Sequence, residues 1–88
     1  MKYKVEISSV ARKQLKKLDR RIVAIIVSWI EKNLNNCENP RLYGKALRGN
    51  LKGLWRYRIG DYRIIAEIED EKLVILIIEI GHRKSIYN

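Results

Sequence analysis

The chain has 88 residues, with 19 Lys and Arg against 10 Asp and Glu and a formal net charge of +9. This length predicts one domain with a single modest core. A lone cysteine, Cys37, excludes an internal disulfide, and a single histidine leaves no zinc-ligand spacing, so we expect no metal or other cofactor. The positive charge makes nucleic acid the leading partner class, although an acidic protein would be attracted by the same charge.

Nothing at the N-terminus resembles a signal peptide, and the apolar run from Leu73 to Ile78 is too short to span a bilayer. A single unpaired cysteine suits a reducing compartment. We therefore expect a cytoplasmic protein that has no membrane partner.

The first half of the chain predicts a strand followed by two helices. Apolar and polar residues alternate from Lys2 to Ile7, as in a half-buried strand. Ser8 or Ser9 can cap the first helix, and Asp19 can cap a second one that ends near Leu34 to Asn36. Each helix has an apolar face, so the two are expected to pack as a hairpin against a sheet.

A basic connection follows the helices, and its charge is uneven. Between Arg41 and Arg63 there are seven basic residues, and Asp61 is the only acidic one. Its glycines match neither a phosphate-binding loop nor a dinucleotide-binding motif, so the sequence gives no support for nucleotide hydrolysis.

Gly60 and Asp61 separate two apolar runs and predict a tight β-hairpin. Because side chains alternate along a strand, Arg56 and Arg58 share one face, and the hairpin places Arg58 opposite Arg63. Like charges placed side by side cost stability, so the pair makes sense if an anion such as an RNA phosphate docks there. A solvated basic face is the alternative interpretation.

The stretch from Leu73 to Ile80 predicts a last strand that is apolar on both faces. If Glu69 pairs with Lys72, the helices cover one face of the sheet, while the other face carries the arginines and an apolar row. This row is a candidate docking groove for another polypeptide, unless twisting of the sheet lets its residues shield one another. The row consists of Ile65, Val74, Leu76, Ile78 and Ile80.

The same pairing brings Ile80 level with Asp61, so the residues after the last strand emerge beside the hairpin turn. Next to the cations of the hairpin, these residues supply an imidazole, which titrates near neutral pH, and an aromatic ring on which a base could stack. The candidate site then consists of Arg56, Arg58, Arg63, His82, Arg83 and Tyr87.

Together these elements predict one α+β domain over residues 1–88, in the order β-α-α-β-β-β. The helical hairpin is expected on one face of a four-stranded, mainly antiparallel sheet. The first strand should lie parallel beside the last, because the apolar edge of the final strand needs a neighbour and the helical hairpin can make the crossover.

This element order and three motifs resemble the RelE/ParE superfamily of bacterial toxins, in particular its RelE-like mRNA endonucleases. The resemblance implies a toxin that enters the A site on the small ribosomal subunit and cuts mRNA there, and that an acidic antitoxin holds inactive in a hetero-oligomer. A ParE-like toxin that inhibits DNA gyrase and a non-catalytic RNA-binding module stay open as alternatives. The motifs are Lys45-Ala46-Leu47-Arg48-Gly49, the run from Leu54 to Arg63, and Ile80-Gly81-His82-Arg83-Lys84 followed by Tyr87.

The resemblance also implies residue roles, with two departures from the family pattern. The RelE prototype has lysines where this chain has Arg56 and Arg58, and arginine is a poor general base because its pKa lies above about 12. The spacing from Arg83 to Tyr87 is also shorter than in the prototype. The general base is therefore the role that the sequence leaves open.

RNA cleavage of this kind needs no metal, because a 2′-hydroxyl can attack the neighbouring phosphate once a base removes its proton. Cations then stabilise the phosphorane. We expect Arg58, Arg63 and Arg83 to bind that phosphate. His82 is the candidate acid or base, and Tyr87 is expected to stack on or orient a base. Further RNA contacts are assigned to Arg48, Lys52, Arg56 and Lys84, and antitoxin contacts to the apolar row.

Overall fold

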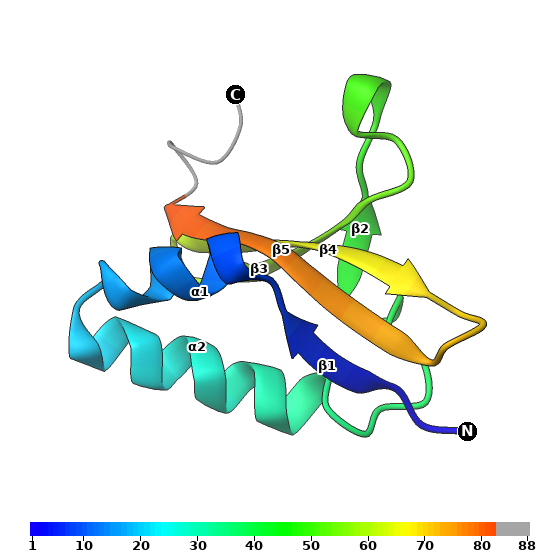
Figure 1. Cartoon of the computed structure of the whole chain (residues 1–88), viewed down its shortest axis with the longest axis horizontal. Helices are drawn as coiled ribbons and strands as arrows, with labels where there is room; N and C mark the ends of the chain where they lie inside the picture. The colour runs from blue at the N-terminus through cyan, green and yellow to red at the C-terminus, as the bar shows by residue number, and fades with distance from the viewer. Residues whose placement is uncertain (83–88) are drawn as a thin grey trace.

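The structure, a computed structural model, describes residues 1–82 as two helices packed on one face of a five-stranded sheet (Figure 1). The sheet order is β1-β5-β4-β3-β2, with β1 parallel to β5 and the other neighbours antiparallel. The elements are β1 (Lys4–Ile7), α1 (Ser9–Lys16), α2 (Arg20–Asn33), β2 (Gly44–Ala46), a 3-10 turn (Gly49–Leu51), β3 (Trp55–Ile59), β4 (Tyr62–Glu69) and β5 (Val74–His82).

The two predicted helices and the parallel pairing of β1 with β5 are confirmed, whereas the prediction of four strands is wrong. The additional strand is β2, whose three residues pair with β3 along the outer edge of the sheet. A three-residue strand that begins with glycine is too short to show an alternating pattern, so the sequence does not distinguish it from the basic connection.

Both helices begin at the caps expected from the sequence. The Ser8 hydroxyl accepts a hydrogen bond from the Ala11 amide at 3.1 Å, and the Asp19 carboxylate accepts one from the Arg21 amide at 3.1 Å. The face of α2 that contacts the sheet carries residues spaced by about one helical turn, such as Ile26 and Ile30. Neither α1 nor α2 has both the length and the apolar character that a membrane span requires.

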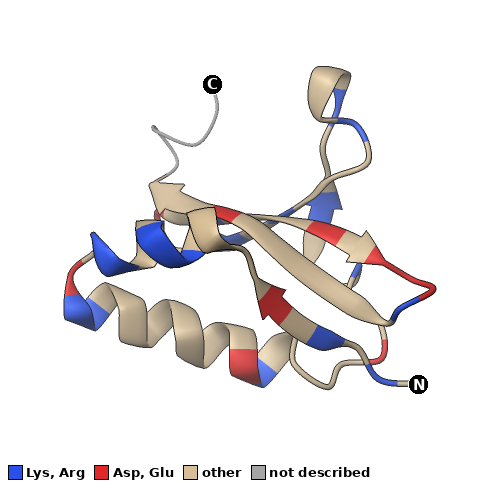
Figure 2. Cartoon of the chain, in the orientation of Figure 1, with Lys and Arg blue, Asp and Glu red and all other residues tan. Residues whose placement is uncertain are grey.

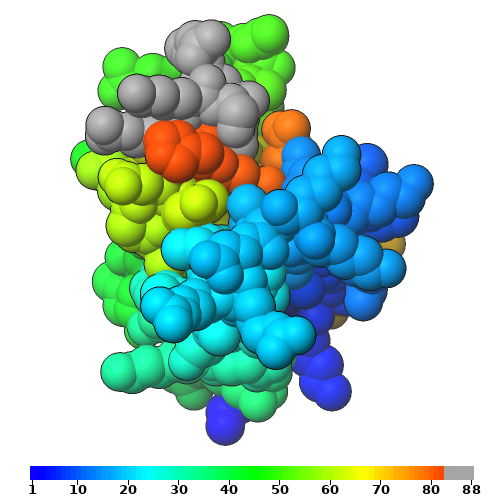
Figure 3. Space-filling view, turned by 90° about the vertical axis from the view of Figure 1, so that its left-hand side faces the viewer, coloured from blue at the N-terminus to red at the C-terminus, as the bar shows by residue number. Residues whose placement is uncertain are grey.

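The β3–β4 hairpin has the predicted register, with Ile59 opposite Tyr62 and Arg58 opposite Arg63. Gly60 adopts a φ of +58°, a conformation that glycine reaches without steric cost. Seen from the end of the molecule in Figure 3, this hairpin (yellow-green) lies beside α2 (cyan). Ile22 and Ile26 of α2 border the same small pocket as the turn, so the hairpin is held against the helix layer.

The predicted register of β4 with β5 is wrong, for two reasons. The turn between them is longer than assumed, so Glu69 pairs with Val74 rather than with Lys72. A β-bulge then shifts the pairing once more between Ile65 and Ala66, because β5 contains one extra residue there. As a result His82 lies opposite Tyr62.

The bulge changes which side chains of β5 face the helices. Ile80 pairs with Ile64 and is 1% exposed within the core, so its assignment to the antitoxin groove is wrong. Ile65 does lie on the arginine face, between Arg56 and Glu79, but it is only 2% exposed. The part of the apolar row that stays partly exposed consists of Val74, Leu76 and Ile78.

Candidate nucleic-acid interface

The face of the sheet opposite the helices carries two rows of basic residues near its β2 edge. Lys45 of β2 lies opposite Arg56 of β3, and Arg58 of β3 lies opposite Arg63 of β4. Lys45 and Arg58 are exposed, and the other two are partly buried. Adjacent strands are about 4.8 Å apart, so the four cationic groups can contact one anionic chain at the same time. We call these four residues the basic face.

The acidic residues of β4 lie away from these cations. Neither Lys45 nor Arg58 forms an ion pair with any residue of 1–82. The acidic residues Glu67 and Glu69 lie at the far end of β4, where Figure 2 shows red, whereas β2 and the loop after it contain blue segments and no red. Such a charge separation attracts an anion to one end of the sheet.

A pocket of about 340 Å³ opens where the basic face meets the edge strand. Gly44 is essential to its shape, because a Cβ at this position would lie 2.3 Å from the Arg56 carbonyl oxygen and 2.7 Å from the Trp55 indole nitrogen. Only glycine lets β3 and the indole approach this closely. The pocket is lined by Leu42, Tyr43, Gly44, Lys45, Arg56 and Arg58.

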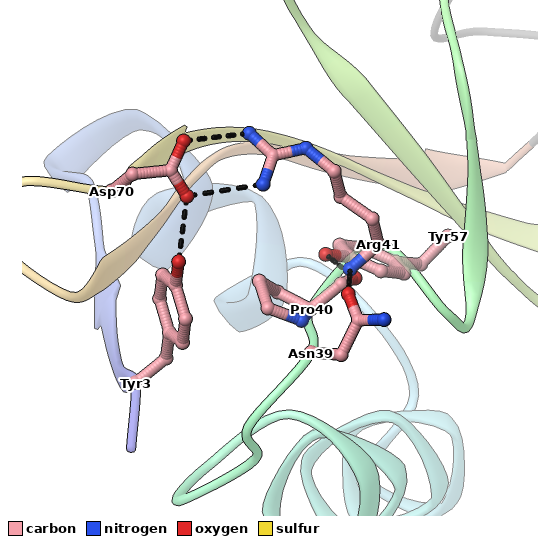
Figure 4. Close-up of polar contacts among 6 residues, drawn as sticks. All are labelled: Tyr3, Asn39, Pro40, Arg41, Tyr57 and Asp70. Carbon is pink, nitrogen blue, oxygen red and sulfur yellow. Dashed lines mark hydrogen bonds and ion pairs between the residues drawn. The ribbon is translucent and has the colours of Figure 1, made fainter. Parts of the chain in front are cut away.

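Four hydrogen bonds drawn in Figure 4 hold the chain segment that leads into this pocket. The Arg41 guanidinium donates two hydrogen bonds to the Asp70 carboxylate, at 3.0 and 2.9 Å, and the Tyr3 hydroxyl donates a third to the same carboxylate at 2.6 Å. The Tyr57 hydroxyl donates to the Pro40 carbonyl at 2.7 Å inside the core. The segment is therefore fastened both to β3 and to the turn between β4 and β5.

The same contacts shift the ionisation of the groups involved. The hydrogen bonds from Arg41 and then Tyr3 lower the pKa of Asp70 to about 2, because both stabilise its charged form. The bond to Asp70 raises the pKa of Tyr3, and burial raises the pKa of Tyr57. Each shift keeps the donor protonated and the acceptor charged at neutral pH, so the contacts persist there.

Comparison with known proteins places this arrangement in a family. The family described as "ParE toxin of type II toxin-antitoxin system, parDE" matches residues 5–87. Toxin RelG of Mycobacterium tuberculosis is 37% identical over 87 residues, which cover 99% of this chain and 98% of that protein. The chain belongs to the RelE/ParE superfamily of type II toxin–antitoxin toxins.

Further relatives agree with this membership. Toxin RelE of Mycobacterium tuberculosis is 38% identical over 85 residues, covering 97% of this chain and 86% of that protein. The toxin–antitoxin complex RelBE2 from the same organism contains a chain with a TM-score of 0.85 and 35% identity, covering 94% of this toxin and 93% of that chain. The resemblance drawn from the sequence motifs is thereby confirmed.

The toxin structure brings together some of the predicted site residues and separates another. Arg56, Arg58 and Arg63 share the basic face, as predicted. His82 does not point to the basic face. Its ring packs edge-on against the ring of Tyr62, with 5.5 Å between the two centroids. Tyr62 pairs with both His82 and the core residue Ile59, so all three side chains lie on the helix side of the sheet. Arg48 and Lys52 are exposed at either end of the 3-10 turn that follows β2. Arg83, Lys84 and Tyr87 lie outside the described residues.

Sequence reasoning missed two residues of this toxin's interface. Glu79 lies opposite Ile65 on the arginine face and forms no ion pair with residues 1–82. Its signal was the break in alternation at Ile77 and Ile78, since an acidic residue directly before the buried Ile80 is best placed by a bulge. Tyr43 borders the pocket and is 43% exposed, and its only signal was an aromatic residue next to cations. Among residues 1–82, no three His, Cys, Asp or Glu side chains gather closely enough to hold a metal ion.

Proposed function

We propose that this chain is a cytoplasmic toxin that cleaves mRNA in the ribosomal A site and so stops translation. The observation that carries the proposal is the basic face, where Arg58 and Arg63 lie side by side on an open sheet surface. Guanidinium groups offer rigid paired donors to phosphate oxygens, and two of them can contact one phosphate from different directions. The membership in the RelE/ParE superfamily supports the same activity.

In this proposal Arg58 and Arg63 stabilise the negative charge that builds up on the phosphorane, and Arg83 joins them as the family resemblance implies. The 2′-hydroxyl attacks the phosphorus, its proton passes to a base, and an acid protonates the leaving 5′-oxygen. Glu79 is a better candidate for the base than arginine, because it is a carboxylate on the same face as Arg63. His82 packs against Tyr62 on the helix side of the sheet, so it is not assigned as the acid.

Few groups on this surface can transfer protons, so alignment of the mRNA by the ribosome has to supply much of the rate. The proposal therefore includes very weak cleavage of free RNA. Binding to the ribosome would depend strongly on salt, because it rests on the high positive charge of the chain.

The proposed inhibitor is an acidic antitoxin that binds this toxin in a hetero-oligomer. A structure of relatives from Mycobacterium tuberculosis is a toxin–antitoxin complex, RelBE2, which supports such a partner. Val74, Leu76 and Ile78 are partly exposed on the sheet face that also carries the arginines, so an amphipathic antitoxin segment can cover them and place carboxylates near the cations. Leu76→Asp should weaken the complex by about 2 kcal/mol if this contact is a hot spot.

Cleavage of ribosome-bound mRNA by purified toxin, mapped by primer extension under single-turnover conditions, tests the activity. Arg58→Ala should lower the cleavage rate about 100-fold, as for removal of other oxyanion donors. Lys72→Ala is the matched control, because Lys72 is a cation of the same chain at the opposite end of β4. Equal rates for Arg58→Ala and Lys72→Ala would reject a catalytic role for the basic face.

A ParE-like toxin that inhibits DNA gyrase is the second candidate, because the matching family is described as the ParE toxin of parDE systems. This candidate predicts inhibition of gyrase supercoiling without mRNA cleavage. Measuring both activities on one preparation separates the candidates, since the first predicts mRNA cleavage with gyrase unaffected.

A further inference from the structure

The pocket at the β2 edge holds an exposed aromatic ring beside Arg58 and two further cations, Lys45 and Arg56, that the proposed cleavage chemistry does not use. We propose that this pocket is a binding subsite for one nucleotide of the RNA, in which the base stacks on Tyr43 and a phosphate contacts Lys45 and Arg58. This inference rests on the proposed function in one respect only, namely that mRNA is the natural ligand of the subsite. It lies next to the Arg58–Arg63 pair, so the nucleotide it holds is close to the phosphate under attack.

The side chain of Tyr43 is partly open to solvent. The residue is 43% exposed, and Leu42 beside it is 68% exposed. One edge-to-face contact fixes the ring of Tyr43, with the Trp29 ring centroid 6.4 Å away and the planes at 84°. A ring that is held in place and partly open to solvent is a platform on which a base can stack, and stacking is available to every base.

The backbone around Tyr43 is held in place before any ligand arrives. Arg41 is fastened to Asp70 by two hydrogen bonds, and its amide also donates to the Asn39 side chain at 3.1 Å. On the other side, Gly44 is packed so tightly against β3 that no side chain fits. Little conformational freedom remains to be lost on binding, and such preorganisation raises affinity.

The size and charge of the pocket favour a nucleotide over an acidic peptide. Its volume of about 340 Å³ is at the lower end of the roughly 300–1,000 Å³ that small-ligand sites span. Its walls combine one aromatic ring with three cationic side chains, Lys45, Arg56 and Arg58, and contain no carboxylate. An aromatic platform next to a cationic groove is the combination that single-stranded nucleic acid uses.

The direct test uses a single-stranded RNA oligonucleotide in which 2′-O-methyl groups block cleavage and one base is 2-aminopurine, whose fluorescence falls when it stacks. Wild-type toxin should quench the probe at one position of the strand. Tyr43→Ala should abolish this quenching and weaken binding about tenfold, whereas Tyr43→Phe keeps the ring and should behave as wild type. Absence of quenching by the wild-type protein at every probe position would overturn the proposal without relying on any variant.

The salt dependence of RNA affinity distinguishes the contribution of the Tyr43 ring from that of the cations. Lys45→Ala removes one phosphate contact, so the slope of log affinity against log salt should become shallower by about 0.7. Tyr43→Ala should leave this slope unchanged, because it removes no charge. A polyglutamate peptide that binds with the same dependence on Tyr43, while RNA leaves the probe unquenched, would assign the pocket to an acidic protein and overturn the nucleotide subsite.

Failure of this inference and failure of the proposed function give different results. If the wild type does not cleave ribosome-bound mRNA but Tyr43 still quenches the probe, the nuclease activity is rejected and the subsite stands. If mRNA is cleaved and Tyr43→Ala changes neither probe quenching nor the preferred cleavage positions, the subsite is rejected and the nuclease activity stands.

Discussion

Replacing Ile80 with alanine tests the β-bulge that decides which residues of β5 face the arginines. Ile80 is 1% exposed in the core, whereas Leu76 on the same strand is only partly buried. The substitution removes three carbon atoms, which are worth about 0.8 kcal/mol each as buried surface. The cavity left behind adds to this, so Ile80→Ala should cost about 3–4 kcal/mol of unfolding free energy.

Leu76→Ala is the matched variant and should cost about 1–2 kcal/mol, because part of its side chain is already in water. Both predictions are tested by urea denaturation followed by tryptophan fluorescence. For a domain of this size each kcal/mol corresponds to about 4–8 °C, so Ile80→Ala should lower the melting temperature by roughly 12–32 °C. A cost for Ile80→Ala no larger than that for Leu76→Ala would place Ile80 on the open face and refute the bulge.

Three further substitutions test the frame of the pocket. Gly44→Ala places a Cβ 2.3 Å from the Arg56 carbonyl oxygen, so it should destabilise the fold by about 1–3 kcal/mol in chemical denaturation; a neutral effect would show that β2 can move away from β3. Tyr57→Phe removes a buried hydroxyl bonded to a main-chain carbonyl and should cost about 1 kcal/mol in the same assay, with no loss expected only if water replaces the bond. Asp70→Asn removes the exposed pair with Arg41, which after screening by solvent is worth about 1 kcal/mol or less. The pKa of Asp70 falls from 3.8 to about 2 on folding, so the stability difference from wild type should be full above pH 4 and vanish as the pH falls to 2; a difference that does not change with pH would contradict the ion pair.

The sequence predicts the parts of the fold that depend on local chemistry. Gly60 and Asp61 set a two-residue turn, and this turn alone determines that Arg58 lies opposite Arg63. The caps at Ser8 and Asp19 likewise set where the helices begin. Each of these features is determined within a few residues, so a single sequence is enough to find it.

The features that the sequence did not predict depend on contacts between distant segments. The bulge in β5 lets Ile80 fill the core under α1, where the Gln14 side chain accepts a hydrogen bond from the Ile80 amide at 2.7 Å. Strict alternation from Leu73 cannot include such an inserted residue, so it predicts the wrong face for both Ile80 and Glu79. The pocket at Tyr43 depends on β2, which pairs with β3 only because Gly44 has no side chain.

The pairing of β1 with β5 has a consequence for how the protein is made. Lys4 meets Val74 across this pair, so the first strand has no partner until 70 further residues have been synthesised. At about 5–20 residues per second the ribosome needs roughly 4–14 s for that stretch. During this interval β1 and the apolar face of the helical hairpin lack the strand that covers them. Premature stop codons anywhere before β5 should therefore abolish toxicity completely, since they leave both ends of the sheet without the strand that joins them.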